Sequence, residues 1–238
     1  MDSQSSQILT FISYPRLTAL QSLSSHVSTN TSILVIGGSG GTGHVALQIA
    51  RCLGAINITT ICSPKNNDFC LSCGATEVID YTKGTEDIVT SLMQSPFKPF
   101  NVVMDCVSSA EPRNMAMNYP SLIQHHSSSH EFLSENYVYR RLGGPSTDWI
   151  RAGLERATGF QWWPNRHEKL FWIRLPGSSG ELRRIKEWVD EGKLRPHIAA
   201  TYEFSAEGVK KAFDDLLSRR VTGKCVVILG ENDTDRNS

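Results

Sequence analysis

The stretch "ILVIGGSGGTGHVALQIARCLGA", residues 33–55, holds five glycines within seven positions. An apolar, β-branched run precedes the glycines, and apolar residues at helical spacing follow them. Glycine loses more conformational freedom on ordering than any other residue, so this density indicates a backbone that bends sharply or that a ligand approaches closely. The stretch predicts a strand, a glycine loop and a helix in direct succession.

Three of these glycines form a dinucleotide-binding pattern. Gly38, Gly40 and Gly43 fit G-x-G-x-x-G between the predicted strand and the predicted helix, the setting in which this pattern binds a diphosphate. We expect a tight turn at Gly38, close approach of the diphosphate at Gly40 and close helix-to-strand packing at Gly43. The helix start, residues 42–44, would direct backbone N–H groups at the phosphates. The alternative is an ordinary glycine-rich strand-to-helix turn.

Strand-like and helix-like patterns alternate on both sides of the loop, which favours the dinucleotide-binding interpretation. Short apolar runs rich in β-branched residues, typical of parallel strands, occupy 32–37, 57–62, 77–80, 100–106, 136–142, 168–176 and 223–229. Apolar residues at helical spacing occupy 16–27, 44–54, 65–73, 86–94, 178–194 and 205–220, and residues 124–135 read as a loop. The sequence predicts an α/β fold with a Rossmann-type doubly wound parallel sheet.

The end of the second predicted strand indicates which dinucleotide is bound. An NAD site places a carboxylate about 20 residues after the glycines to hold the ribose hydroxyls, but this position reads "ICSPKNN". Ser63 offers a hydroxyl and Lys65 a cation, which together favour the 2′-phosphate of NADPH. We therefore expect NADPH as the cofactor. In the alternative, Lys65 is a solvated residue in the first turn of a helix.

Composition and charge exclude several function classes. The 238 residues include 24 Lys and Arg and 24 Asp and Glu, so the basic surface of a nucleic-acid-binding protein is not expected. No apolar run reaches the length of a membrane span, and the first residues carry no export or clear targeting signal. We expect no membrane insertion and a cytoplasmic or mitochondrial location.

The six cysteines fit a reducing compartment better than a disulfide scaffold. Cys70 and Cys73 form a single C-x-x-C, but no second pair follows at the spacing of a structural zinc site. His125, His126 and His130 lie in the predicted loop without an accompanying acidic or cysteine ligand at fixed spacing. We expect no metal site.

Several segments together resemble a known family. They read "GGSGGTGHVALQIARCLGA", "ITTICSPKN", "LSCGATEVIDY", "KPFNVVMDCVSS" and "FSAEGVKKAFDDLLSRRVTGKCVVIL". The chain resembles the zinc-free quinone-oxidoreductase branch of the medium-chain dehydrogenases/reductases, most closely the reticulon-interacting mitochondrial oxidoreductases, over roughly residues 15–229. The resemblance implies NADPH-dependent reduction of a quinone or an activated alkene without metal.

The resemblance also implies which residues bind the cofactor. The family's phosphate loop falls on Gly40, Gly41, Thr42 and Gly43, its 2′-phosphate contacts on Ser63, Lys65 and Tyr81, and its nicotinamide side on Val107, Leu142, Phe171 and Trp172. With Gly38 and Ser39 of the glycine loop, these make the expected cofactor site. Tyr81 could instead pack on the sheet as a strand-end aromatic. No catalytic residue can be named.

The chain departs from the family at two places. Ser108 and Ser109 stand where relatives carry two glycines, and residues 110–135 match poorly, so the nicotinamide pocket is expected to differ. At the front, about fifteen residues stand in place of most of a GroES-like catalytic domain. We expect a tail and linking helix over 1–29, the Rossmann domain over 30–195, a GroES-like remnant over 196–229 and a disordered tail over 230–238. Apolar faces that the absent part would cover should then be exposed, or covered by a partner subunit.

Two functions are therefore in competition. The first is an NADPH-dependent oxidoreductase that transfers hydride to a small-molecule quinone or enone. The second is a truncated, catalytically silent NADPH-binding remnant or interaction module. Because relatives often dimerise through sheet edges, a homodimer joined at the strand around residues 170–174 is also expected.

Overall fold

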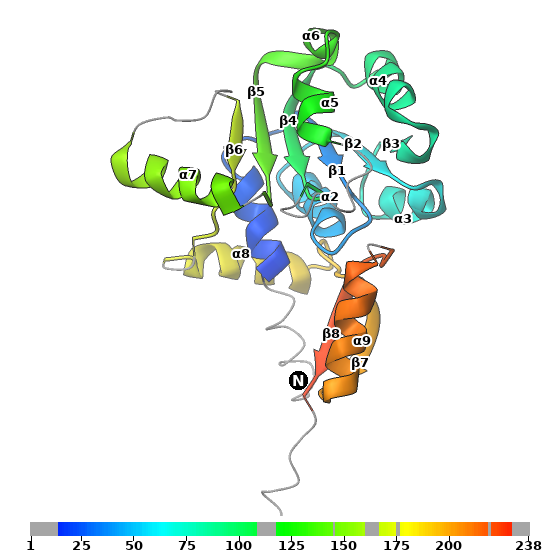
Figure 1. The fold of residues 1–238 in the computed structure, drawn as a ribbon, viewed down its shortest axis with the longest axis vertical. Coiled ribbons are helices and arrows are strands. Elements are labelled where there is room, and N and C mark those ends of the chain that lie inside the picture. The colour runs from blue at the N-terminus through cyan, green and yellow to red at the C-terminus, as the bar shows by residue number, and fades with distance from the viewer. Residues whose placement is uncertain are drawn as a thin grey trace, which may run out of the picture.

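The computed structural model describes residues 14–108, 118–144, 146–159, 167–174, 177–218 and 220–229. Figure 1 shows a central parallel sheet with helices on both faces and a smaller unit beside it. The expected tail 230–238 and the first 13 residues lie outside the described residues.

The central sheet has six parallel strands in the order β3-β2-β1-β4-β5-β6. The strands are β1 (Ser32–Ile36), β2 (Asn57–Cys62), β3 (Glu77–Asp80), β4 (Phe100–Asp105), β5 (Leu133–Arg141) and β6 (Glu168–Leu170). This is the strand order of the dinucleotide-binding Rossmann fold, whose ligand site lies where the order reverses, between β1 and β4. The predicted fold class is confirmed.

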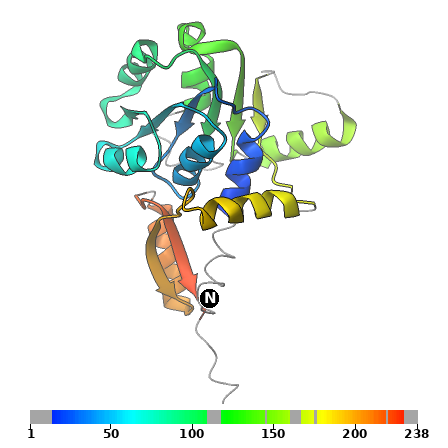
Figure 2. The ribbon, with the colours of Figure 1, turned by 180° about the vertical axis from the view of Figure 1, so that it is seen from behind.

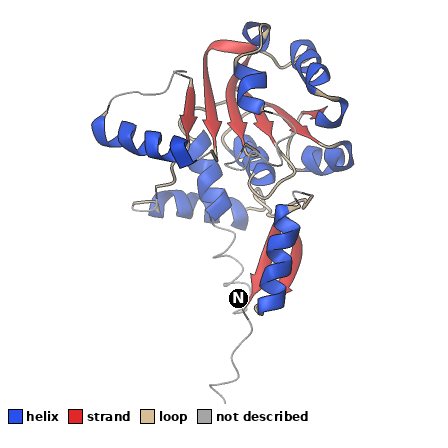
Figure 3. Cartoon of the chain, in the orientation of Figure 1, coloured by secondary structure: helices blue, strands red, loops and turns tan. Residues whose placement is uncertain are grey.

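Helices cover the two faces of this sheet (Figures 1 and 2). They are the helix 14–23, α2 (Gly43–Cys52), α3 (Asn67–Ser72), α4 (Thr85–Gln94), α5 (Tyr119–Gln124), α6 (Ser129–Phe132) and α8 (Ser179–Asp190). A further helix, α7 (Ser146–Thr158), lies beside β6 at the edge of the sheet (Figure 1). Two short 3₁₀ turns, Pro64–Asn66 and Tyr81–Lys83, follow β2 and β3. Figure 3 shows the resulting helix–sheet–helix layers.

Side-chain alternation along β1 builds a separate core on each face. Ile33 and Val35 pack with the helix 14–23, α2 and α8, whereas Leu34 and Ile36 pack with α4, α5 and α6. All four are fully buried, as expected of a strand covered on both faces. The helix 14–23, which the sequence assigned to a linking segment, is therefore part of the central core.

The smaller unit is a second sheet with one helix. Two parallel strands, β7 (Ile198–Glu203) and β8 (Lys224–Ile228), flank α9 (Ala206–Leu217). Ser205 caps α9 by accepting a hydrogen bond from the N–H of Gly208 at 3.0 Å, as predicted from its position.

Three secondary-structure predictions were wrong. Residues 124–135 are not a continuous loop, because α6 and the start of β5 lie within them. The strand predicted over 168–176 ends at Leu170. Residues 146–158 form α7, where only an aromatic segment was expected. None of the side chains described in α7 is buried. Ile150 and Leu154, four residues apart, were the available sign of a helix.

Candidate functional site

The carboxyl ends of the strands meet along one edge of the sheet. Backbone hydrogen bonds continue the parallel pairing one residue beyond the strands: the Leu142 N–H donates to the Asp105 carbonyl at 3.0 Å and the Phe171 N–H to the Arg141 carbonyl at 2.8 Å. The Gly37 N–H donates to the Ile61 carbonyl at 2.9 Å in the same way. The predicted residues thus share one edge, which is where open α/β sheets bind ligands.

The turn out of β1 is made at Gly37, one residue earlier than predicted. Gly37 has a φ of +82°, a left-handed conformation that favours glycine. At Gly38 the requirement for glycine is steric, because a Cβ there would lie 2.1 Å from the Thr60 hydroxyl oxygen of β2. Val107 packs over the turn, since a Cβ at Gly37 would lie 2.4 Å from a Val107 methyl carbon.

Gly43 packs the start of α2 against the turn, as predicted. A Cβ at Gly43 would lie 2.0 Å from the Gly37 carbonyl oxygen, so no side chain fits. At Gly40 the nearest atom to such a Cβ is 3.4 Å away, an ordinary contact. Because packing within the protein does not require glycine at Gly40, a ligand approaching this part of the loop is the better explanation of its presence.

The first turn of α2 carries neither a negative charge nor a side-chain cap. The helix carries no acidic residue in its first turn, and the Thr42 side chain makes no capping hydrogen bond to it. The early N–H groups of a helix and its dipole favour negative charge. The start of α2 therefore has no side-chain cap beside the glycine loop, although the His44 N–H already donates to the Gly40 carbonyl at 3.1 Å.

His44 braces this helix start from inside the protein. Its Nδ1–H donates to the Gly40 carbonyl at 2.8 Å, and its Nε2 accepts from the His197 N–H at 3.1 Å. Burial lowers the pKa of His44, and the charges of His197 and Arg16 lower it further. The ring is thus held neutral, in the tautomer that this pair of hydrogen bonds requires. The sequence offered no sign of this role beyond the position of His44 in the first turn.

Asn66 joins the ends of β1 and β2, a role that the sequence interpretation missed. Its Nδ2 donates to the Ser39 hydroxyl at 3.0 Å and to the Ser63 hydroxyl at 3.2 Å. Its Oδ1 accepts from the Thr222 hydroxyl, which precedes β8, at 2.9 Å. The structure therefore brings Ser39 and Ser63 together through a third residue. The signal was the spacing of three between Ser63 and Asn66 within one helical turn.

The smaller unit also contacts the glycine loop through its backbone. The Gly223 N–H donates to the Ser39 carbonyl at 2.9 Å, and a Cβ at Gly41 would lie 3.3 Å from the Gly223 carbonyl oxygen. Gly41 therefore leaves room for the chain that leads into β8. The loop is held from two sides, by the sheet and by the smaller unit.

Lys65 and Tyr81 lie at the same edge, after β2 and β3, and both are exposed. The Asp80 carboxylate at the end of β3 accepts from the Thr82 N–H at 2.8 Å and from the Thr82 hydroxyl at 2.7 Å. This carboxylate therefore caps the 3₁₀ turn that directly follows β3. The end of β2 itself carries no carboxylate, as the sequence indicated.

Asp105 organises the loop after β4 and was also missed. It is fully buried; its Oδ1 accepts from the N–H groups of Val107 and Ser108, both at 2.9 Å. Its Oδ2 accepts from the Tyr139 hydroxyl at 2.7 Å. Burial, with the nearby Asp105, raises the pKa of Tyr139 well above its usual value. A polar residue that ends an otherwise apolar strand was the available signal.

The predicted nicotinamide side is only partly assembled. Leu142 and Phe171 are half-buried beside the ends of β4 and β5. Trp172 is 46% exposed and makes an edge-to-face contact with Trp149 of α7, with ring centres 5.6 Å apart. Trp172 is thus directed toward α7 in the described structure.

The residues present fit a dinucleotide. Packing within the protein does not require glycine at Gly40, and no side chain caps the start of α2. The Ser108 hydroxyl after β4 is buried with no hydrogen-bond partner among the described residues, a group that a ligand at this edge could satisfy. The site therefore has places for the phosphates and an unused donor near the expected nicotinamide side.

A protein-family model described as zinc-binding dehydrogenase matches residues 73–227. The chain belongs to this family. Within the described residues no group of three or more His, Cys, Asp or Glu side chains could hold a metal ion, despite the family's name. The same residues contain no helix that is long and apolar enough to cross a membrane.

Curated relatives and solved structures agree with the resemblance inferred from the sequence. The chain is 29% identical over 219 residues to the trans-enoyl reductase pgmF of Aspergillus terreus, covering 90% of this chain and 57% of that protein. It is 31% identical over 199 residues to the mitochondrial NAD(P)H oxidoreductase RTN4IP1 of Mus musculus, covering 82% and 47%.

The quinone oxidoreductase structure from Coxiella burnetii shares the fold with a TM-score of 0.67 at 24% identity, covering 91% of this chain and 59% of that one. This likeness shows the fold. The predicted resemblance to the reticulon-interacting mitochondrial oxidoreductases is confirmed by the mouse relative. The chain spans about half the length of the curated relatives that it matches.

Proposed function

We propose that this chain binds NADPH along the carboxyl edge of its sheet and serves hydride transfer to a quinone or an activated alkene. The observation that carries the proposal is the glycine loop at the switch point between β1 and β4, together with the Asn66 bridge between Ser39 and Ser63. The relatives' names support the reaction class, since one is a trans-enoyl reductase and another an NAD(P)H oxidoreductase.

Each part of the edge would have a distinct role. The loop and the first N–H groups of α2 would hold the diphosphate. Ser63 and Lys65 would hold the 2′-phosphate, one by a hydroxyl donor and one by charge. NADPH would supply the hydride, while Val107, Leu142 and Phe171 would orient the nicotinamide and exclude water. His44 would act indirectly by fixing the loop carbonyl at Gly40.

The preference for NADPH over NADH is tested by fluorescence titration with both cofactors. We expect NADPH to bind at least about tenfold more tightly, because a charged contact to the 2′-phosphate contributes roughly 1.5–3 kcal/mol. Equal affinities would contradict the assignment.

The variant Asn66→Asp sharpens this test. An aspartate still accepts hydrogen bonds from the hydroxyls of Ser39 and Ser63 after they rotate, but its charge would repel a 2′-phosphate. We expect NADPH affinity to fall by about tenfold or more, and NADH affinity to change by less. Asn57→Asp, which lies at the opposite end of β2, is the matched control and should leave the ratio of the two affinities unchanged.

The competing proposal, a silent cofactor-binding module, is supported by the chain's coverage of about half of its relatives. Steady-state oxidation of NADPH with a simple quinone and with an enone decides between the two. Turnover supports the reductase. Tight NADPH binding without turnover on either acceptor would leave the binding module.

Location and assembly complete the proposal. The mitochondrial relative suggests a mitochondrial location, which imaging of a tagged full-length chain would test. Strand β6 forms one edge of the central sheet, so a homodimer would join there. A monomer in sedimentation at micromolar concentration would contradict the dimer.

A further inference from the structure

A cavity of about 330 Å³ is lined by His26 and by residues within or next to β5 and β6, and by no residue of the glycine loop. Its polar lining comes from His26, Asn136, Tyr137, Arg140, His167 and Lys169. His26 follows the end of the helix and precedes β1, and Asn136 and Tyr137 lie in the first half of β5. Arg140 and Lys169 lie one residue before the carboxyl ends of β5 and β6. The cavity therefore extends along these two strands, and no residue of the candidate cofactor site lines it.

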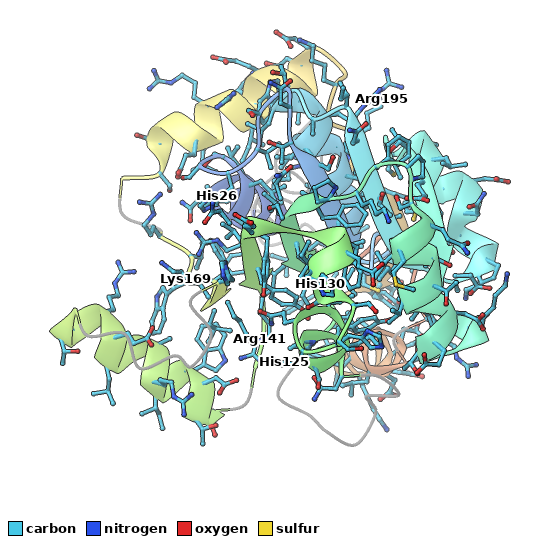
Figure 4. The ribbon with its side chains drawn as sticks, turned by 90° about the horizontal axis from the view of Figure 1, so that it is seen from above. His26, His125, His130, Arg141, Lys169 and Arg195 are labelled. Atoms are coloured by element: carbon cyan, nitrogen blue, oxygen red, sulfur yellow. The ribbon has the colours of Figure 1, made fainter. Side chains whose placement is uncertain are left out.

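The residues that line this cavity carry positive charge and no negative charge. Its lining includes the cations Arg140 and Lys169 and the rings of His26 and His167, but no acidic side chain. Among the described residues no carboxylate forms an ion pair with Arg140 or Lys169. In Figure 4 the labelled His26 and Lys169 extend from the helix end and from β6 on the same side of the molecule. Cations gathered in this way favour an anionic ligand.

Arg140 has an unsatisfied hydrogen-bond donor in this cavity. Its Nε is buried with no hydrogen-bond partner in the described structure, and its Nη2 donates to the His26 Nε2 at 2.5 Å. The neighbouring Arg141, on the other face, pairs with Asp148 and with Glu168 at 3.2 Å. A guanidinium normally satisfies several donors on a carboxylate or a phosphate. Arg140 therefore lies in an environment typical of an anion-binding arginine, and no carboxylate of the described residues occupies the place of the anion.

The two histidines are placed to respond to an anion. Because Arg140 donates to Nε2 of His26, that ring is neutral, and burial, followed by the charges of Arg140 and Lys169, lowers the pKa of His26. The His167 Nδ1–H donates to the Tyr137 carbonyl at 2.8 Å, and its ring stacks on Tyr137 with centres 4.3 Å apart. A bound anion would offset the repulsion between these groups.

We propose that this cavity binds a phosphate group, free or as part of a small phosphate ester, independently of the cofactor site. A phosphate carries close to two negative charges and several strong acceptor oxygens, which match two full cations better than a single carboxylate does. The cavity volume lies at the lower end of the range for small-molecule sites. A phosphate group with a small substituent is therefore the ligand class that fits.

The test is a titration of the full chain with inorganic phosphate, at constant ionic strength, followed by NMR of the histidine side chains. We expect the signals of His26 and His167 to shift saturably. His44 and His197, which lie beside the glycine loop, report separately on any phosphate bound there. Acetate serves as the comparison anion and should bind more weakly. No response from His26 and His167, or tighter binding of acetate, would overturn the proposal.

A matched pair of lysine variants completes the test. Lys169→Gln removes an exposed cation of the cavity and should weaken the phosphate response of His26 by about tenfold. Lys211→Gln, an exposed lysine of α9, should leave it unchanged. Equal effects of the two variants would show unspecific screening and refute the site. Because no dinucleotide is used, a failure to bind NADPH would not affect this result.

Discussion

Strands β1 and β7 belong to the same chain but are buried to very different degrees. Every residue of β1 is buried, whereas in β7 only Tyr202 is. The six-stranded sheet has helices on both faces, and the two-stranded sheet has only α9 (Figure 1). A strand covered on both sides closes a core by itself, and a strand covered on one side does not.

The smaller unit exposes the apolar surface that its fold leaves uncovered. Phe204, Phe213 and Leu217 are 67%, 59% and 63% exposed, and Leu216 is 56% exposed. The sequence analysis expected such faces to be exposed or covered by a partner subunit, and in the single chain they are exposed. What holds this unit in place is mainly polar: the contacts of Gly223 with Ser39, of His197 with His44 and of Thr222 with Asn66. The comparison teaches that one unit is stabilised by burial and the other by its attachment to the loop.

The largest expected effect comes from Gly43→Ala at the end of the glycine loop, which both units contact elsewhere. The new methyl group would lie 2.0 Å from the Gly37 carbonyl oxygen, so either β1 or α2 must move. We expect a loss of roughly 3–5 kcal/mol in the free energy of unfolding and loss of NADPH binding, measured by denaturant unfolding and by titration. Gly153→Ala in α7, where an added Cβ meets nothing within 4 Å, should stabilise by about 0.5–1 kcal/mol. Equal stability of the two variants would contradict the packing at Gly43.

The same truncation in each unit tests the comparison directly. Leu47→Ala removes a fully buried side chain of the central core, and should cost roughly 2–5 kcal/mol because it leaves a cavity. Leu216→Ala acts on an exposed side chain of α9 and should change the free energy of unfolding by about 0.5 kcal/mol or less. Chemical denaturation of both variants measures the difference. A large loss for Leu216→Ala would mean that another surface covers α9 in solution.

A smaller effect is expected where the units join. Thr222→Val keeps the shape but removes the hydroxyl that donates to Asn66, so the free energy of unfolding should fall by about 1 kcal/mol. Hydrogen exchange should show faster opening of β8 than of β1. Thr201→Val, an exposed residue of β7, is the control. If both variants open β8 equally, the Thr222 link does not hold the unit.

The smallest expected effect is a dependence of stability on pH through His44. Its pKa is lowered in the folded state, so below the ordinary histidine value the unfolded chain binds more protons than the folded chain. The free energy of unfolding should therefore fall as the pH decreases below about 6.5. His44→Gln should reduce this slope and His125→Gln, at an exposed position, should not. His26 also has a lowered pKa, so part of the slope should remain. A slope unchanged by His44→Gln would refute the role of His44.

The sequence predicted the centre of the fold better than its periphery. Strands β1 to β4 were identified because they are short, β-branched and buried on both faces, so local pattern and burial agree. The start of β5 was missed because Ser134 and Glu135 are polar residues within it. Helix α7 was missed although Ile150 and Leu154 have helical spacing; both are exposed, 64% and 51% respectively, so the helix adds no side chain to either core.

The candidate site was predicted to a similar extent. Ser63 and the glycine loop could be predicted because each directly follows a predicted strand and because their residue types, a hydroxyl and glycines, indicate phosphate binding. Asn66, Asp105 and His44 could not be assigned roles, because each acts through partners distant in the chain, such as Thr222 at a separation of 156 residues.

The sequence by itself determined the glycine loop, the strand-to-helix junction and the α/β class, because each depends on residue types within one short window. Only the tertiary structure decided that the turn lies at Gly37, that Asn66 joins two strands to the smaller unit, and that Arg140 shares an acid-free cavity with His26. These features depend on which side chains meet once the strands pair and the helices pack. Such contacts are determined by burial and hydrogen bonding between residues distant in the chain, and no local sequence pattern predicts them.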